Sequence, residues 1–170
     1  TAAKKALKKR VAYAEGEDRR VLRAVQVVAD EGLARPVLVG RGSIILARIE
    51  KLGLRMQEGR DFEIVNIDDE SRYRDYWQTY HRLTERRGVT EQFAKIEMRR
   101  RLTLIASMLL HKGEVDGMIC GTWGSTAMHL QNVDAIIGKR AGVKTYACMN
   151  GLILPGRQVF LVDTHINYDP

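Results

Sequence analysis

The residues best suited to bind an anion form a short loop rich in glycine and hydroxyl groups, Gly-Thr-Trp-Gly-Ser-Thr at residues 121–126. An apolar, strand-like run at 115–120 precedes the loop, and a helical pattern follows it. The first turn of a helix has unpaired N–H groups and a partial positive charge, and glycine lets the backbone approach a ligand closely. The loop therefore predicts either an anion-binding turn or an ordinary strand-to-helix turn with Ser125 or Thr126 as N-cap.

The cysteines, histidines and clustered acidic residues lack the number or spacing that disulfides or a metal site would need. Cys120 and Cys148 are too few for a disulfide framework, so a reducing cytoplasm is the default location. The four histidines share no metal-ligand spacing with one another or with the cysteines. The acidic run 68–70 is interpreted as a solvated loop and helix cap, because adjacent side chains point apart. The sequence predicts no metal site.

Size and charge narrow the function classes. A chain of 170 residues that is 45% hydrophobic and 29% charged is composed like one globular domain. No apolar run approaches the roughly 18–20 residues that span a bilayer. The net charge is +7, but most basic residues are scattered and no nucleic-acid motif accompanies them. We expect neither a membrane nor a nucleic-acid partner, while a positive field favours phosphorylated small molecules.

Strand-like and helical periods alternate along most of the chain. Predicted strands lie at 10–14, 36–39, 62–65 and 115–120, and the helices between them begin at the predicted N-caps Asp18, Ser43 and Thr90. Strands that alternate with helices of ten or more residues indicate βαβ units. We therefore predict an α/β fold, a three-layer αβα sandwich with a mostly parallel sheet.

The last part of the chain departs from this alternation. Three strands are predicted in succession, near 143–148, 151–154 and 158–163, and Pro155-Gly156 indicates a hairpin between the last two. We interpret residues 1–150 as a first αβα domain and 151–170 as the start of a second. Because this ending would leave sheet edges unpaired and the chain opens on Thr1, we expect a truncated two-domain protein.

Several motifs, in one collinear order, resemble the phosphate acetyl/butyryltransferase family. They lie at 10–24, 37–40, 113–117, 121–126 and 160–164. The resemblance runs from about residue 10 to 170 and corresponds to the first half of such a domain. It implies a layered fold of the isocitrate/isopropylmalate dehydrogenase type.

A narrower resemblance concerns residues 61–66, 72–77, Tyr80 and 86–90. These segments are similar to the version fused to the C-terminus of bacterial NADP-dependent malic enzymes, where the transferase-like domain is taken to sense acetyl-CoA. The resemblance implies a cytoplasmic homo-oligomer and no cofactor in this segment. It also implies a malic enzyme domain in the same chain that uses NADP and Mg or Mn to convert malate to pyruvate and CO2.

The transferase motif after the loop is incomplete. Where the family carries His-Ser-x-x-Asp-Thr-x-Arg-Pro, this chain has Gly124 for the histidine, Met128 for the aspartate and Gln131 for the arginine. Glutamine does not replace a charged bidentate donor, which puts acyl transfer to phosphate in doubt. We therefore assign no catalytic residue.

Three functions stay open: an acetyl-CoA-binding regulatory domain, a catalytic phosphate acetyltransferase that makes acetyl phosphate and CoA, and an assembly module. For acetyl-CoA or phosphate binding, the candidate residues are Gly121, Thr122, Gly124, Ser125, Thr126 and Asn150. Glu15 and Glu17 end a strand where open α/β sheets bind ligands, although helix capping is an equal alternative. His129 is expected on or near its helix surface.

Overall fold

The structure, a computed structural model, describes residues 8–164, 166 and 167, which fall into two compact units that divide between Ile137 and Gly138. The predicted division into residues 1–150 and 151–170 stays a prediction, and residues 1–7, 165 and 168–170 lie outside the described residues.

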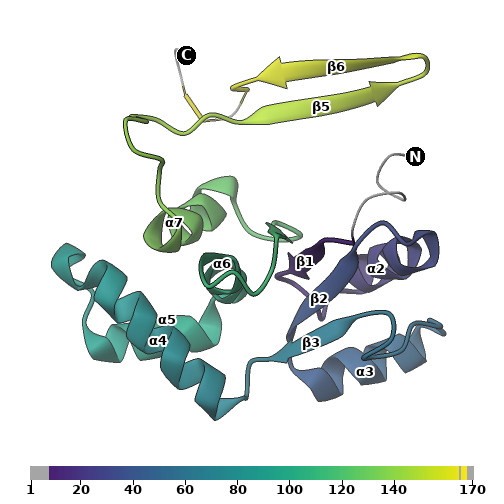
Figure 1. The fold of residues 1–170 in the computed structure, drawn as a ribbon, viewed down its shortest axis with the longest axis horizontal. Coiled ribbons are helices and arrows are strands. Elements are labelled where there is room, and N and C mark those ends of the chain that lie inside the picture. Colours follow the sequence, from purple (N-terminus) through teal and green to yellow (C-terminus); the bar gives the residue numbers. More distant parts are fainter. Residues whose placement is uncertain (1–7, 165, 168–170) are drawn as a thin grey trace. The chain divides into compact units, whose positions relative to one another are not determined.

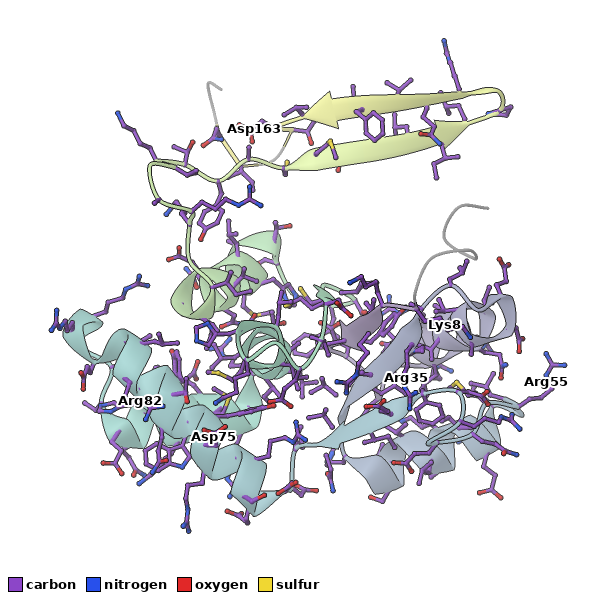
Figure 2. The ribbon with its side chains drawn as sticks, viewed as in Figure 1. Lys8, Arg35, Arg55, Asp75, Arg82 and Asp163 are labelled. Carbon is purple, nitrogen blue, oxygen red and sulfur yellow. The ribbon has the colours of Figure 1, made fainter. Side chains whose placement is uncertain are left out.

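The first unit contains a four-stranded parallel sheet in the order β3-β2-β1-β4 (Figure 1). Its strands are β1 (Arg10–Tyr13), β2 (Arg35–Gly40), β3 (Glu63–Asn66) and β4 (Gly117–Ile119). Glu63 fixes the amino end of the three neighbouring strands, because its carboxylate pairs with Arg10 and with Arg35, each at 2.6 Å. Arg35 is labelled in Figure 2. The predicted parallel α/β sheet is confirmed.

Helices cover both faces of this sheet. They are α2 (Arg19–Glu31), α3 (Gly42–Lys51), α4 (Glu70–Thr84), the 3-10 turn η1 (Glu85–Arg87), α5 (Glu91–Arg100), α6 (Leu102–His111) and α7 (Thr126–Ile136). Successive strand side chains point to opposite faces: Ala12 and Val37 pack with residues of α4–α7, whereas Tyr13 and Leu38 pack with α2 and α3. Figure 1 shows α2 and α3 across the sheet from α6. The three-layer arrangement is confirmed.

Two of the three predicted helix caps are observed. Asp18 accepts a hydrogen bond from the Arg20 amide and Thr90 accepts one from the Phe93 amide. The prediction for Ser43 was wrong: α3 begins one residue after β2, and Arg41 is its N-cap without a side-chain capping bond. Instead, the Glu17 carboxylate accepts from the Arg41 amide at 2.9 Å. The start of α3 is therefore fixed by the loop that follows β1.

The second unit is a two-stranded antiparallel hairpin, β5 (Met149–Leu154) and β6 (Arg157–Val162), joined at Pro155-Gly156 as predicted. The prediction of a strand near 143–148 was wrong, because those residues form a loop with a single bend at Thr145. The Val143 amide donates to the Arg140 carbonyl, and β5 pairs with β6 only from Met149 onward. The apolar pattern before Met149 has no ladder partner among the described residues. No described helix is long and apolar enough to cross a membrane.

A single close approach fixes the turn after β1. A Cβ added to Gly16 would lie 2.7 Å from the Val39 carbonyl oxygen and 2.9 Å from the Val39 nitrogen, both backbone atoms that cannot rotate away. We expect Gly16→Ala to lower the free energy of unfolding by about 1–3 kcal/mol, measured by urea denaturation. Gly117→Ala is the matched control, because its Cβ would meet no atom within 4 Å. Equal stability of the two variants would contradict this account.

Candidate functional site

The candidate site lies at the carboxyl edge of the parallel sheet. The chain runs from β1 to its neighbour β2, and later returns to place β4 on the other side of β1. In open α/β sheets, ligands bind outside the carboxyl ends of strands at such a reversal of strand order. The loops that follow β1 and β4 meet here, and the Ala14 amide donates to the Ile119 carbonyl at 3.0 Å.

Glu15 joins the two loops. One carboxylate oxygen accepts from the Gly121 amide at 3.0 Å, and the other accepts from the Thr122 hydroxyl at 3.3 Å. The residue is only 3% exposed. Gly121 and Thr122, two of the predicted anion-binding residues, therefore already donate to the carboxylate of Glu15. From the sequence, Glu15 could bind a ligand or cap the next helix. In the structure it joins the loops after β1 and β4, and Asp18 caps α2.

The second half of the loop has donors that are still available. Ser125 is the N-cap of α7 and accepts from the Met128 amide at 3.3 Å, so the capping alternative is observed there. The amides of Thr126 and Ala127, in the first turn of α7, have no intrahelical acceptor. The side chains of Ser125 and Thr126 are exposed. This part of the loop keeps the properties of an anion-binding helix start.

Gly124 has a geometric reason for being glycine. Its φ is +94°, a conformation that other residues rarely adopt, and a Cβ would lie 2.4 Å from the Met128 terminal carbon and 3.2 Å from His129 Nε2. A side chain at position 124 would therefore require the terminal carbon of Met128, the end of a flexible side chain, to move aside.

His129 is buried, at 8% exposure, contrary to the expectation that it lies near the helix surface. Its Nε2 lies 2.7 Å from the Trp123 carbonyl oxygen and its Nδ1 lies 2.8 Å from the Thr103 hydroxyl. Because a carbonyl only accepts, Nε2 is the donor, and in the neutral ring Nδ1 accepts from Thr103. The sequence feature that could have indicated a buried histidine is Thr103, a polar residue within the apolar helix α6 that can pair with it.

Three cavities open around these loops. Two of them, of about 330 and 440 Å³, share Glu15, Arg100, Leu102 and Trp123 in their walls. The first extends along α6 and α7 to Thr103 and Asn132, and the second extends to Arg41 and Arg48. A third, of about 380 Å³, is lined by Gly121, Gly124 and Thr126 together with Cys120, His129, Leu130 and Val133. Three of the predicted residues therefore share one cavity.

Asn150, the remaining predicted residue, belongs to the second unit. Its amide nitrogen donates to the Thr164 hydroxyl at 2.8 Å. Its role in ligand binding stays a prediction. Among the described residues there is no group of three or more His, Cys, Asp or Glu side chains that could hold a metal ion.

An ordered carboxylate–guanidinium pair closes the second cavity. The two Glu17 oxygens accept from Arg41 Nε and Nη2 at 2.9 and 2.8 Å, and the Glu17 carbonyl accepts from Arg48. The hydrogen bonds from Arg41 hold the pKa of Glu17 below its usual value, although burial acts in the opposite direction. Glu17 therefore positions two arginines at the cavity wall.

The fold defines an α/β domain in which the loops after β1 and β4 meet at the carboxyl edge of a parallel sheet. The family model for phosphate acetyl/butaryl transferase matches residues 1–170, and the chain belongs to that family, as its motifs predicted. Among solved structures, a phosphotransacetylase from Streptococcus pyogenes superposes with a TM-score of 0.82 at 25% identity, over 96% of this chain and 49% of that one. A phosphotransacetylase from Staphylococcus aureus, at 22% identity, shares the fold with a TM-score of 0.80 over 94% of this chain and 47% of that one.

The curated relatives include malic enzymes. The chain is 47% identical to the NADP-dependent malic enzyme of Haemophilus influenzae over 98% of its own length and 22% of that enzyme. It is 44% identical to the NADP-dependent malic enzyme of Escherichia coli over 95% of its length and 21% of that enzyme. The predicted resemblance to the transferase-like part of these enzymes is confirmed, and the chain spans about a fifth of the malic enzymes it matches.

The role of Glu15 can be tested by truncation. Glu15→Ala removes the acceptor of the Gly121 amide and of the Thr122 hydroxyl. We expect a loss of about 1–3 kcal/mol in the free energy of unfolding, because each of the two hydrogen bonds contributes about 0.5–1.5 kcal/mol. Glu50→Ala on the exposed face of α3 is the control and should change stability by less than about 0.5 kcal/mol. If both variants unfold at the same urea concentration, the Glu15 bridge is not what holds the loop.

The Glu17–Arg41 pair predicts a pH effect. Because the pKa of Glu17 is lower in the folded chain, the pair stabilises the fold fully above its ordinary value of 4.5, and this contribution is lost as the pH falls through the lowered pKa. Below about pH 4.5, stability should therefore fall less steeply in Arg41→Gln than in wild type. Arg74→Gln, which removes an exposed charge from α4, should keep the wild-type slope. Identical slopes in all three proteins would rule out the pair as a source of acid sensitivity.

Proposed function

We propose that this chain is the regulatory, phosphotransacetylase-like domain of an NADP-dependent malic enzyme, and that it binds acetyl-CoA as an allosteric effector. The observation that carries the proposal is the contrast between two groups of relatives. Identity is 44–47% to the malic enzymes, but 26–32% to phosphate acetyltransferases.

Under this proposal, the chemistry occurs in another domain of the same polypeptide. That domain would hold NADP and Mg or Mn and convert malate to pyruvate and CO2, while the present domain contributes no cofactor. The parent protein would be a cytoplasmic homo-oligomer. Residues 1–150 would form the first domain of the transferase-like part, and 151–170 the beginning of its second.

The two halves of the loop after β4 have different roles in this proposal. Gly121 and Thr122 are engaged by Glu15, so their part is to hold the loop. Gly124 gives close backbone access, while Ser125, Thr126 and the free amides of the first turn of α7 donate to the anionic part of acetyl-CoA. Asn150 stays a predicted acetyl-CoA-binding residue.

Catalytic phosphate acetyl transfer is the second candidate, because family membership and the fold are shared with phosphotransacetylases. The substitution at Gln131, which lies exposed on α7, argues against it. Transfer needs phosphate held next to the acyl group, and the family's arginine at this position has the geometry for that task. Synthesis of acetyl phosphate from acetyl-CoA and phosphate by the full-length protein would favour this candidate.

The regulatory proposal predicts a selective loss of inhibition. In the full-length protein, acetyl-CoA should inhibit malate-dependent NADPH formation, with a coupling of roughly 5–150-fold in affinity. Ser125→Ala with Thr126→Val should need several-fold more acetyl-CoA for the same inhibition, because two hydroxyl donors are lost.

A second variant separates ligand binding from helix capping. Ser125→Asp keeps a side-chain acceptor at the N-cap but places a negative charge where the ligand anion is expected, so it should weaken inhibition without unfolding α7. Thr90→Asp makes the same exchange at the N-cap of α5 and should leave inhibition unchanged. Inhibition that is equal in wild type, Ser125→Asp and Thr90→Asp would exclude the loop as the acetyl-CoA site.

A further inference from the structure

The two cavities that share Glu15 and Trp123 also share a cation without a counter-charge. Arg100 ends α5, is exposed and lines both cavities. Its neighbours are paired, Arg99 with Glu70 at 2.5 Å and Arg101 with Glu97 at 3.0 Å. Within residues 8–164, 166 and 167, no side chain or carbonyl pairs with Arg100. Its charge is therefore available to a ligand in either cavity.

A second cation faces the same space. Arg48 lines the second cavity, and it donates to the backbone carbonyl of Glu17 rather than to a described carboxylate. The acidic side chains in that wall are already engaged: Glu17 by Arg41, Asp18 by Arg20, and Glu15 by the loop donors. An entering anion therefore meets two arginines that form no salt bridge with a described side chain, beside Glu17 and Asp18, which are each paired with another arginine. Arg48 still attracts the Glu17 carboxylate, and the donors that bind Glu15 are neutral groups.

Trp123 supplies a flat apolar surface beside these cations. Its side chain is 55% exposed, yet the backbone around it is fixed. Its carbonyl accepts from His129, and the preceding carbonyl, of Thr122, accepts from Arg20 at 3.0 Å. A large aromatic ring held in water on a rigid backbone is suited to stack against a planar ring of a ligand.

We propose that these two cavities bind the nucleotide end of a ligand, with the heteroaromatic base on the Trp123 indole and a phosphate between Arg48 and Arg100. Guanidinium groups bind phosphate oxygens with charge-assisted hydrogen bonds. Each cavity volume, about 330 and 440 Å³, lies in the range of roughly 300–1,000 Å³ found for small-molecule sites. The inference rests on the proposed function in identifying the ligand as acetyl-CoA, whose adenosine carries such phosphates.

Binding measurements on the full-length protein test this site. Acetyl-CoA and adenosine 3′,5′-bisphosphate, which lacks the acyl arm, are titrated calorimetrically into wild type, Arg100→Gln, Trp123→Leu and Trp123→Phe. Arg74→Gln on α4 is the control, because it removes an exposed arginine outside both cavities. We expect Arg100→Gln and Trp123→Leu to weaken both ligands about tenfold or more, while Trp123→Phe retains most of the affinity and Arg74→Gln retains all of it.

The outcomes separate this inference from the proposed function. Acetyl-CoA binding that is equal in wild type, Arg100→Gln and Trp123→Leu overturns the nucleotide site and leaves the regulatory function standing. Arg100-dependent binding of the bisphosphate, without inhibition of malate oxidation by acetyl-CoA, supports the site and overturns the regulatory function. If wild type binds neither ligand, both are overturned.

Discussion

The carboxylate of Glu15 is the constraint on which the edge of this domain depends. A buried carboxylate is costly unless its oxygens are hydrogen-bonded, and both oxygens of Glu15 find donors only in the loop after β4. The bridge ties the ends of two neighbouring strands, β1 and β4, which are more than a hundred residues apart in the chain. The position of Trp123 and the start of α7 follow from where this bridge holds the loop.

The same bridge changes how the glycine-rich loop can be understood. From the sequence, all the small and hydroxyl residues of 121–126 are equivalent candidates for a ligand anion. In the structure they divide into two groups, because Gly121 and Thr122 face inward to Glu15 while Ser125 and Thr126 lie at the exposed helix start. Part of the anion-binding capacity of the loop is used to hold the fold together.

The layered fold could be predicted from the sequence because β1 and β2 are short apolar runs between helical patterns, as buried parallel strands are. Both faces of these strands are buried, and successive residues pack into the two cores in turn. The predictions failed where an element depends on a distant partner. The apolar run at 143–148 has strand periodicity but no neighbouring strand to pair with among the described residues. Ser43 has the chemistry of a cap, but Glu17 fixes the helix start from another loop. The pairing of Arg101 with Glu97 follows from their i,i+4 spacing. The sequence does not distinguish Arg99 from Arg100, because Arg99 finds its carboxylate on another helix, at Glu70.

The positions of the arginines bear on the choice between a binding domain and a transferase. A transferase gains rate by holding phosphate and acyl group in a fixed near-attack geometry, for which a charged residue on the helix after the loop is well placed. Here that helix carries Gln131. The arginines of the second cavity that form no salt bridge with a described side chain are Arg48 on α3 and Arg100 at the end of α5. Cations arranged around the rim of a cavity can hold a large anionic ligand by its phosphates without bringing a second substrate to its acyl group. This arrangement suits the effector site that we propose, since an effector is held and released unchanged and its binding energy biases the conformation of the rest of the protein.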